Sequence, residues 1–343
     1  MRTGYRRKAA SLAVLAALAG CSGTPSTRTS SPIPTGAASP SPSPSPEPTR
    51  SAARVNPRSV RADELGVVPV LMYHQLLATP KGDYDQTPAQ FRAELEQLYR
   101  TGYRTVTVAD VAAGKIDLPA GASPMVLTFD DSTASQYGEL PDGTVDPATA
   151  VGILLAVAKA HGDGHPVASF YVNAAPFRGK DAYLAKLHAL GMEIGEHTAT
   201  HANLRQLDDT GVQRELVQGL GVITRQVPAA DVTTMALPFG VLPRNAALAH
   251  RGSWRGHAYS FRAVLLVGAD PAKSPYSKGF DALALPRIRS GRRTGDQAFT
   301  STYWLPKLLK HRYVSDGDPG VISFPRAEAA RLAPAFAAKA RPY

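Results

Sequence analysis

Short apolar runs alternate with amphipathic segments along most of the chain after residue 66. Runs of four to eight apolar residues predict buried strands, whereas apolar residues three or four positions apart predict helices. The predicted strands are residues 67–73, 124–131, 166–173, 192–197, 232–240, 263–269 and 281–288. Segment 104–114 supplies a further strand and a short helix, and longer helices are predicted at 87–103, 146–162, 181–191 and 211–227.

Strands that alternate with helices in this way are typical of a parallel sheet covered by helices. For this many strands, a closed or nearly closed sheet is more natural than an open one. We therefore predict an α/β fold, namely a distorted (β/α) barrel with about seven strands.

The N-terminal residues follow a different pattern. A basic stretch that includes Arg6, Arg7 and Lys8 precedes the apolar run at residues 9–20. A run of about twelve apolar residues is too short to span a bilayer but fits the core of a signal peptide. We therefore predict that residues 1–20 are a lipoprotein signal peptide and that the protein is exported.

The single cysteine, Cys21, ends the sequence "LAGC", which resembles a bacterial lipobox. In a lipobox the leader is cut before the cysteine, which then carries the lipid. The small residues before Cys21 and the polar tail after it favour lipidation over the alternative, a buried free cysteine. Since more than one acyl chain holds a protein stably on a membrane, we expect a lipid anchor at the cell envelope and a folded domain outside the cytoplasm.

Ser, Pro and Thr dominate the sequence that follows Cys21. Such a segment cannot bury enough apolar surface to offset the entropy lost on ordering, so residues 21–60 are predicted to be a disordered tether. The folded domain is then residues 61–343, with a core at about 67–290 and a C-terminal extension at about 291–343. With Cys21 lipidated, this domain contains no disulfide.

The net charge of +10 is concentrated near the N-terminus. Residues 1–60 hold eight basic residues and one acidic residue, and the remaining 30 basic and 27 acidic residues nearly balance. The sequence shows no basic stripe with interleaved aromatic residues, so a nucleic-acid partner is not expected.

Polar side chains stand at the ends of several predicted strands. His74 ends the first strand, Asp130 and Asp131 end "MVLTF", and His197 ends "MEIGE". Neighbouring side chains on a strand point to opposite faces, so the two aspartates should have different tasks, although a solvated turn is the alternative. Because chemistry in a parallel barrel lies at the C-terminal strand ends, this placement favours a functional site.

His197 and His201 are four residues apart. In a helical turn their imidazoles would share one face and could bind the same ion, although this spacing also occurs by chance. Together with an aspartate from a neighbouring strand end, they predict a site of two histidines and one carboxylate with open positions for water and substrate. Zinc is the expected ion, and cobalt, nickel or iron would also suit these ligands.

Three motifs, "LTFDDS", "EHTATH" and "LPFG", resemble in this order the first three motifs of the NodB-type polysaccharide deacetylases, carbohydrate esterase family four. The segments "PVLMYHQL" and "FRAELEQLYRTGYRTVTVADV" are similar to the entry segment of the branch that acts on poly-N-acetylglucosamine. The resemblance covers roughly residues 67–290. It implies a NodB-type deacetylase fold and the removal of acetyl groups from a glycan.

The resemblance also implies roles for individual residues. Asp130 would be the general base, and Asp131 would bind a divalent metal ion together with His197 and His201. Thr198 would brace the histidine loop by hydrogen bonds. The segment formed by Pro238 and Phe239 would shape the substrate groove.

The sequence departs from the family pattern at several positions. Ala236 and Leu237 stand where many members carry an Arg that pairs with the base, and Ser132 replaces a common Gly. No Leu-x-x-His motif, the usual source of the general acid, occurs after residue 260. An insert at about 137–165 separates the two aspartates from the next strand.

Two residues are candidates for the missing groups. His74 could be the general acid, because its strand end faces the expected site, or it could be a structural histidine. Arg287 could pair with the base in place of the missing Arg, or it could be an ordinary surface or salt-bridged residue.

The leading functional hypothesis is a metal-dependent hydrolase that releases acetate from N-acetylglucosamine units of a polysaccharide. Peptidoglycan, poly-N-acetylglucosamine and chitin-like polymers are all open as substrates. The alternatives are a glycan-binding envelope lipoprotein without turnover and an O-acetyl esterase. We expect a monomer whose partners are the N-acetylated polysaccharide and, through Cys21, the membrane.

Overall fold

A computed structural model of the protein describes residues 55–343, except residue 269 and residues 291–298. The chain divides into two units, Met1–Arg50 and Ser51–Tyr343, and all described residues belong to the second. The predicted signal peptide, the lipidation site Cys21 and the tether as far as residue 54 lie outside the described residues and stay predictions.

The central sheet has eight strands, and all of their pairings are parallel. Seven strands follow the order β10-β1-β3-β4-β5-β6-β9, and β2 pairs with β3 off this path. The strands are β1 (Val70–Tyr73), β2 (Tyr103–Val106), β3 (Ser123–Phe129), β4 (Ser169–Val172), β5 (Glu193–Glu196), β6 (Thr234–Ala236), β9 (Ala263–Leu265) and β10 (Ile288–Arg289). Their C-terminal ends therefore meet at one edge of the sheet.

One short segment connects the two outer strands of this path. Leu285 forms a parallel bridge with Leu265 of β9. Three residues later, Ile288 pairs with Leu71 of β1. The sheet therefore curls into a nearly closed barrel, which confirms the predicted α/β class and the distorted (β/α) barrel of about seven strands.

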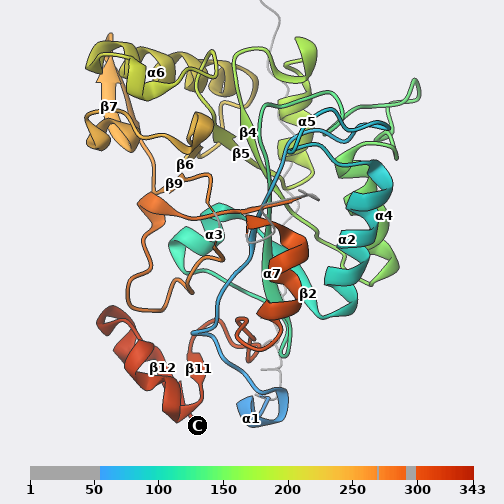
Figure 1. Cartoon of the computed structure of the whole chain (residues 1–343), viewed down its shortest axis with the longest axis vertical. Helices are drawn as coiled ribbons and strands as arrows, with labels where there is room; N and C mark the ends of the chain where they lie inside the picture. Colours follow the sequence, from blue (N-terminus) through green and yellow to red (C-terminus); the bar gives the residue numbers. More distant parts are fainter. Residues whose placement is uncertain (1–54, 269, 291–298) are drawn as a thin grey trace, which may run out of the picture. The chain divides into compact units, whose positions relative to one another are not determined.

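Helices cover the outside of the sheet, and α2 (Pro88–Arg100) packs beside α4 (Ala150–Ala160) (Figure 1). The other α-helices are α1 (Pro57–Val60), α3 (Val108–Ala113), α5 (Tyr183–Ala189), α6 (Asp209–Gln226) and α7 (Ser301–Leu308). The short 3-10 helices are η1 (Pro176–Arg178), η2 (Leu204–Gln206), η3 (Pro238–Gly240), η4 (Ala246–Ala249), η5 (Ala282–Ala284), η7 (Arg326–Arg331) and η8 (Pro334–Lys339). None of the described helices combines the length and apolar character needed to cross a membrane.

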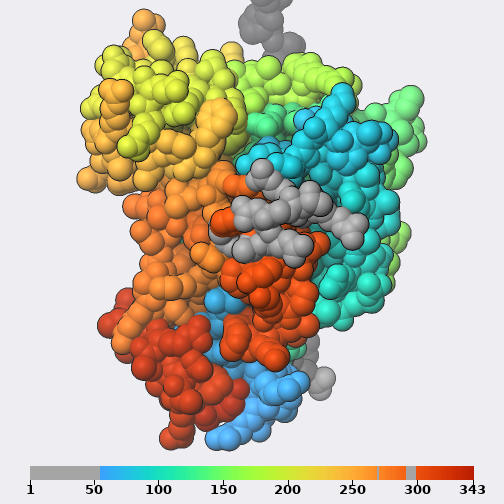
Figure 2. All heavy atoms as spheres, viewed as in Figure 1, coloured from blue at the N-terminus to red at the C-terminus, as the bar shows by residue number. Residues whose placement is uncertain are grey.

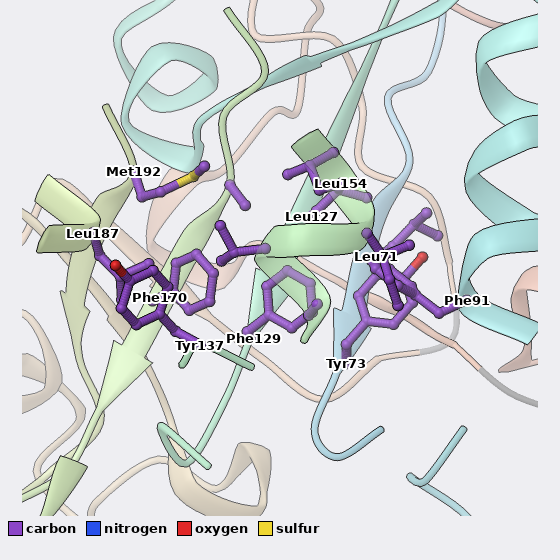
Figure 3. Packing of buried hydrophobic residues seen from close by; sticks show 14 of the residues in the cluster. Leu71, Tyr73, Phe91, Leu127, Phe129, Tyr137, Leu154, Phe170, Leu187 and Met192 are labelled. Atoms are coloured by element: carbon purple, nitrogen blue, oxygen red, sulfur yellow. The ribbon is translucent and has the colours of Figure 1, made fainter. Parts of the chain in front are cut away.

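The predicted insert at about 137–165 contains α4, the helix that leads from β3 to β4. The Thr149 side chain accepts a hydrogen bond from the N–H of Gly152 and caps the start of this helix. The apolar face of α4 is buried, and Tyr137 is also part of the core (Figure 3). Much of the insert is therefore the crossover that a parallel pair of strands requires.

Side-chain alternation along β3 separates two buried layers. Leu127 and Phe129 pack in the cluster that contains the apolar residues of α2 and α4 (Figure 3). Val126 belongs to a second cluster on the opposite face of the strand. Asp130 continues the Val126 face by two-residue periodicity, so its carboxylate points into the barrel.

The first described residues pack against the C-terminal extension, where blue and red surfaces meet in Figure 2. The hydroxyl of Tyr343 donates a hydrogen bond to the carbonyl of Ala62 at 2.8 Å. The extension also contains a parallel pair of strands, β11 (Ile322–Phe324) and β12 (Ala340–Pro342). The C-terminal extension is therefore part of the same folded unit as the barrel.

Three sequence-based boundaries differ from the structure. Helix α1 occupies Pro57–Val60, so the folded domain includes residues that we assigned to the tether. The predicted strand at 281–288 is mostly irregular, because Asp281 caps the turn η5 and Pro286 lacks a backbone N–H. The antiparallel hairpin β7 (Arg251–Trp254) and β8 (His257–Ser260) was not predicted, since its residues are largely polar and exposed.

Glu64 makes the stability of the contact between the first described residues and the C-terminal extension depend on pH. Its carboxylate accepts hydrogen bonds from the Tyr313 hydroxyl at 2.8 Å and the Ser323 N–H at 2.7 Å. Burial raises the pKa of Glu64 to about 8, despite the opposing effect of the Ser323 contact. The folded protein therefore holds a proton on Glu64 that the unfolded chain releases near pH 4.5, and the stability linked to this group falls as the pH rises from about 4.5 to 8.

We predict that Glu64→Gln, which cannot ionise, stabilises the protein at pH 8.5 by about 1–3 kcal/mol, the usual penalty for a buried polar group that is incompletely compensated. Urea unfolding at pH 5, 7 and 8.5 measures this difference. The partly exposed Glu328→Gln serves as the control and should leave the pH dependence unchanged. An equal pH dependence for wild type and Glu64→Gln would contradict the assignment.

Candidate functional site

The C-terminal edge of the barrel gathers the polar residues that the sequence pointed to. They follow four different strands: His74 comes after β1, Asp130 and Asp131 after β3, His197 and His201 after β5, and Pro238 and Phe239 after β6. Arg287 approaches from the segment just before β10. The barrel topology thus brings together residues that lie more than 150 positions apart.

Asp130 and Arg287 form a buried, bidentate ion pair. Arg287 Nη1 donates to Asp130 Oδ1 at 2.8 Å, and Arg287 Nη2 donates to Oδ2 at 2.9 Å. The arginine is completely buried and its remaining Nε donates to the carbonyl of Leu266 at 2.8 Å. Burial alone would raise the pKa of Asp130, but Arg287 together with His197 and His74 outweighs burial and holds the pKa well below its usual range. Asp130 is therefore ionised at any ordinary pH.

Asp131, His197 and His201 form a second group. Asp131 Oδ1 lies 3.5 Å from His197 Nε2 and 3.5 Å from His201 Nε2. The three ligand atoms all lie within 4.8 Å of one another, and these residues are the cluster in the described part of the chain that could hold a metal ion. Two ligands about 2.0–2.2 Å from a tetrahedral zinc ion are themselves about 3.4 Å apart, so the spacing fits such an ion.

The orientation of His197 supports this interpretation. Its Nδ1 lies 2.7 Å from the carbonyl of Ala236, so Nδ1 carries the proton and donates it. The buried Nε2 has no hydrogen-bond partner, and its lone pair points to the space shared with Asp131. A histidine whose second nitrogen is fixed by a carbonyl is the usual arrangement of a metal ligand.

The charges around these histidines also favour a cation. Burial alone would lower the pKa of His197, but Asp130 and Asp131 outweigh it and raise the pKa above its ordinary value. For His201, burial and the neighbouring His197 lower the pKa. Two carboxylates thus attract positive charge to the group, and a metal ion would compete with a proton for His197.

The histidine segment is a loop and not the helical turn considered from the spacing. Thr198 and His201 both have positive φ angles, 64° and 56°, which bring the two rings together at a centroid distance of 5.0 Å. Thr198 Oγ1 accepts a hydrogen bond from the N–H of Ala202 at 3.2 Å, which agrees with its predicted bracing position. Glu215 of α6 accepts a hydrogen bond from the N–H of Thr200 at 2.9 Å and ties the loop to the helix.

Left-handed backbone is concentrated at this site. Of the nine described residues other than glycine with positive φ, five are Asp131, Ser132, Thr198, His201 and Phe239. Each such residue costs of order 1–3 kcal/mol, which the surrounding structure must offset. The sequence predicts different tasks for Asp130 and Asp131 because neighbouring side chains on a strand point to opposite faces. In the structure the two side chains do belong to different groups, but Asp131 lies beyond the end of β3 and is oriented by its left-handed backbone.

Gln136 is a supporting residue that the sequence did not reveal. Its buried amide donates to the carbonyl of His74 at 2.7 Å and to the carbonyl of Asp130 at 2.5 Å. These bonds fasten the ends of β1 and β3 to each other. Ser132, the unexplained departure from the family pattern, is buried, and its carbonyl accepts a hydrogen bond from the N–H of Phe177 at 2.7 Å.

His74 lies next to the ion pair, with Nε2 3.9 Å from Asp130 Oδ2. Burial lowers the pKa of His74, although Asp130 opposes this effect. The imidazole is therefore mainly neutral at neutral pH. Its position brings it within reach of a group bound beside Asp130, as a proton donor or acceptor would require.

Phe239 forms the outer wall of the site. Its ring is 59% exposed and meets the His201 ring edge-on at a centroid distance of 4.8 Å. Pro238, in contrast, is buried and opens the turn η3. An exposed aromatic ring beside the ligand cluster offers a surface on which a sugar ring can pack.

A family comparison agrees with this geometry. Residues 118–252 match the family model described as polysaccharide deacetylase. The matched range includes both aspartates, both histidines and the turn at Pro238. This part of the chain is therefore similar to polysaccharide deacetylases, which are hydrolases that act on carbon–nitrogen bonds other than peptide bonds. No curated protein matches the chain.

Solved structures share the fold. The Streptococcus pyogenes deacetylase PplD, solved in complex with acetate, aligns with a TM-score of 0.51 and 16% identity over 71% of this chain and 98% of that chain. BC0361, a polysaccharide deacetylase from Bacillus cereus, aligns with a TM-score of 0.51 and 18% identity over 71% of this chain and 69% of that chain. At these identities the similarity concerns the fold.

We predict that Arg287→Gln destabilises the protein by about 3–5 kcal/mol, because it leaves the Asp130 charge buried without its partner. Chemical denaturation measures the loss. The double variant Asp130→Asn with Arg287→Gln removes both charges and should recover part of the stability. Equal destabilisation by the single and double variants would show that the ion pair is not the cause.

The helix α6 supplies a second test, because Gly219 faces the start of the histidine loop. A Cβ atom at Gly219 would collide with the buried Glu196 carboxylate and lie 3.2 Å from the carbonyl carbon of Thr198. We expect Gly219→Ala to cost about 1–3 kcal/mol of stability and to disturb the histidine pair.

The matched control lies two residues away in the same helix. A Cβ atom at Gly221 would meet nothing within 4 Å. Gly221→Ala should therefore stabilise the protein by up to about 1 kcal/mol through helix propensity. Thermal unfolding measures the stability of the two variants. If Gly219→Ala is as stable as the wild type, α6 does not position the histidine loop.

Proposed function

We propose that the protein is a metal-dependent enzyme that hydrolyses the N-acetyl amide of N-acetylglucosamine units in a polysaccharide and releases acetate. The observation that carries this proposal is the juxtaposition of two different groups at one strand end. Asp130 is an ionised carboxylate held by Arg287, and the adjacent Asp131 shares a possible ion site with His197 and His201. A base beside a metal site is the arrangement that amide hydrolysis needs.

The ligand chemistry favours a divalent ion, most simply Zn²⁺, with Co²⁺ or Ni²⁺ as alternatives. Asp131, His197 and His201 would hold it through one oxygen and two imidazole nitrogens. When bound, such an ion supplies a Lewis acid that polarises the acetyl carbonyl and makes water more acidic. His197 Nε2 is already oriented for this task by the bond from Nδ1 to the carbonyl of Ala236.

Asp130 and His74 are the side chains that would transfer protons during hydrolysis. Asp130 stays ionised because of Arg287, so it can take the proton of the attacking water as a bond forms to the acetyl carbon. The same pairing makes protonated Asp130 a ready donor. We propose that the proton reaches the departing amine through His74, whose Nε2 lies 3.9 Å from Asp130 Oδ2. The carbon–nitrogen bond then breaks, and acetate and a free amine are the products.

The two alternative functions are glycan binding without turnover and hydrolysis of O-acetyl esters. A glycan-binding protein without turnover would have little reason to bury the Asp130–Arg287 pair, since desolvating two charges is costly. An O-acetyl esterase would use the same groups, because esters and amides are cleaved through similar steps. The exposed ring of Phe239 is compatible with peptidoglycan, poly-N-acetylglucosamine or a chitin-like polymer.

The proposed cellular setting rests on the sequence of the N-terminal region. We propose that Cys21 carries the lipid and that residues 22–54 let the domain reach a polymer of the envelope. Labelling of the protein with a radioactive fatty acid, and its loss in Cys21→Ala, would test the anchor independently of the enzyme.

We predict that the domain from residue 55 onward binds about one divalent ion per chain and releases acetate from N-acetylglucosamine oligomers. Asp130→Asn should reduce acetate release by at least about 1,000-fold while the metal content stays near wild type, since its charge but not its shape is lost. Asp131→Ala should lose both the metal and the activity. Elemental analysis and an acetate assay measure the two quantities.

Two results would count against this assignment. If Asp130→Asn loses the metal and Asp131→Ala keeps it, the roles of the two aspartates are reversed. If the metal-loaded protein releases no acetate from any amide or ester glycan, the enzymatic proposal is wrong.

A further inference from the structure

Arg289 occupies the position on β10 that follows Arg287 on the same face of the strand. Side chains two residues apart on a strand point the same way, and each such step advances by about 6.6 Å. Arg287 reaches Asp130 inside the barrel, while Ile288 points to the opposite layer. Arg289 pairs with Met72 of β1, so it lies one step closer to the C-terminal edge, on the side of the barrel where His74 follows β1.

Aromatic rings hold the Arg289 side chain. Its guanidinium carbon lies 5.3 Å from the centre of the Tyr84 ring and 5.7 Å from the centre of the Phe299 ring. Tyr84 in turn contacts the His74 ring at a centroid distance of 4.8 Å. His74 is the neighbour of Asp130, so an unbroken series of contacts connects Arg289 to the proposed base.

Arg289 differs from Arg287 in that no charged partner is found for it among the described residues. Among the described residues, Arg289 forms no ion pair, and its buried Nε atom has no hydrogen-bond acceptor. An arginine is always charged, and a buried Nε donor that is left unsatisfied costs free energy. Such a residue at the rim of the proposed glycan site indicates an acceptor that the described residues do not supply.

We propose that Arg289 binds a carboxylate of the substrate, on the sugar next to the N-acetylglucosamine unit that is deacetylated. The inference rests on the proposed function and narrows it from N-acetylated glycans in general to acidic ones. The planar guanidinium matches a carboxylate with two parallel hydrogen bonds. Tyr84 and Phe299 restrict its rotation, so little side-chain entropy is lost when the anion binds.

A carboxylate on a glycan of this kind can come from two sources. In one, a lactyl ether on an amino sugar carries it, as in the alternating glycan strands of peptidoglycan. In the other, it belongs to a uronic acid. Both present the same planar anion, and neutral homopolymers of N-acetylglucosamine lack it. Arg289 would therefore select against such homopolymers.

The test compares four oligosaccharides of equal length with the metal-loaded protein. They are a neutral N-acetylglucosamine oligomer, a peptidoglycan strand freed of its peptides, the same strand with its carboxylates reduced to alcohols, and a copolymer of N-acetylglucosamine with glucuronic acid. We expect kcat/KM to be about 10- to 100-fold higher for at least one carboxylate-bearing substrate than for the neutral ones, the size of one charged bidentate contact.

Variants of Arg289 test whether this residue causes the preference for carboxylate-bearing substrates. Arg289→Gln should abolish the preference, so that the carboxylate-bearing oligomers react no faster than the neutral and reduced ones. Arg289→Lys, which keeps the charge but not the planar fork, should retain a smaller preference. Arg225→Gln on the exposed surface of α6 is the matched control and should behave as wild type. An equal loss of rate on all four substrates in Arg289→Gln, or no preference in wild type, overturns the proposal.

Binding measurements separate this proposal from the enzymatic one. Titration of Asp130→Asn with the acidic strand and with its reduced form gives two dissociation constants that do not require turnover. Tighter binding of the acidic strand that disappears when Arg289→Gln is added supports the role of Arg289, even if the wild type releases no acetate. Equal binding of the two strands by Asp130→Asn overturns the role of Arg289 regardless of the activity.

Discussion

The bidentate pair between Asp130 and Arg287 is the interaction on which the rest of the site depends. Neither charge is tolerable alone inside the barrel, so each fixes the other and both fix the backbone that carries them. Asp130 ends β3, and Arg287 lies between the bridge of Leu285 to β9 and the pairing of β10 with β1. The pair therefore lies where the barrel closes. The same ion pair holds the proposed base and stabilises the segment that connects the two outer strands of the sheet. The arginine of this pair comes from a segment more than 150 positions after Asp130.

The left-handed backbone around the pair lowers the stability of the fold but places the side chains of the candidate metal site. Asp131 and His201 reach their positions through left-handed conformations, which place three ligand atoms within 4.8 Å of one another. Gln136 fastens the strand ends on one side, and Glu215 fastens the histidine loop on the other. These hydrogen bonds hold the backbone of the cluster in place without a bound ion, which lowers the ordering cost that the binding energy of an ion would have to offset.

The sequence predicted this site well where the signal was local and poorly where it was not. Apolar runs located the strands, and their polar ends located Asp130, Asp131 and His197, because both patterns depend on neighbouring residues. Arg287 could only be a candidate, since its partner is 157 positions away and no local pattern connects the two. The histidine loop was expected to be helical from its spacing alone, and the positive φ of Thr198 has no signal in its residue type. Gln136 was not identified, because an amide that bonds two backbone carbonyls leaves no pattern in the sequence.

The packing of the C-terminal extension against the first residues of the domain has a consequence for the order of folding. Ser323 contacts Glu64 across 259 positions, and Tyr343 contacts Ala62 across 281. Contacts of such long range form late, because much of the chain must be arranged before they can stabilise anything. Tyr313, Ile322 and Phe324 belong to the same buried cluster as Val68 and Val70, so a chain that lacks its last residues exposes part of this apolar surface. During synthesis the domain is therefore expected to remain open and dependent on protection from aggregation until nearly its whole length is available.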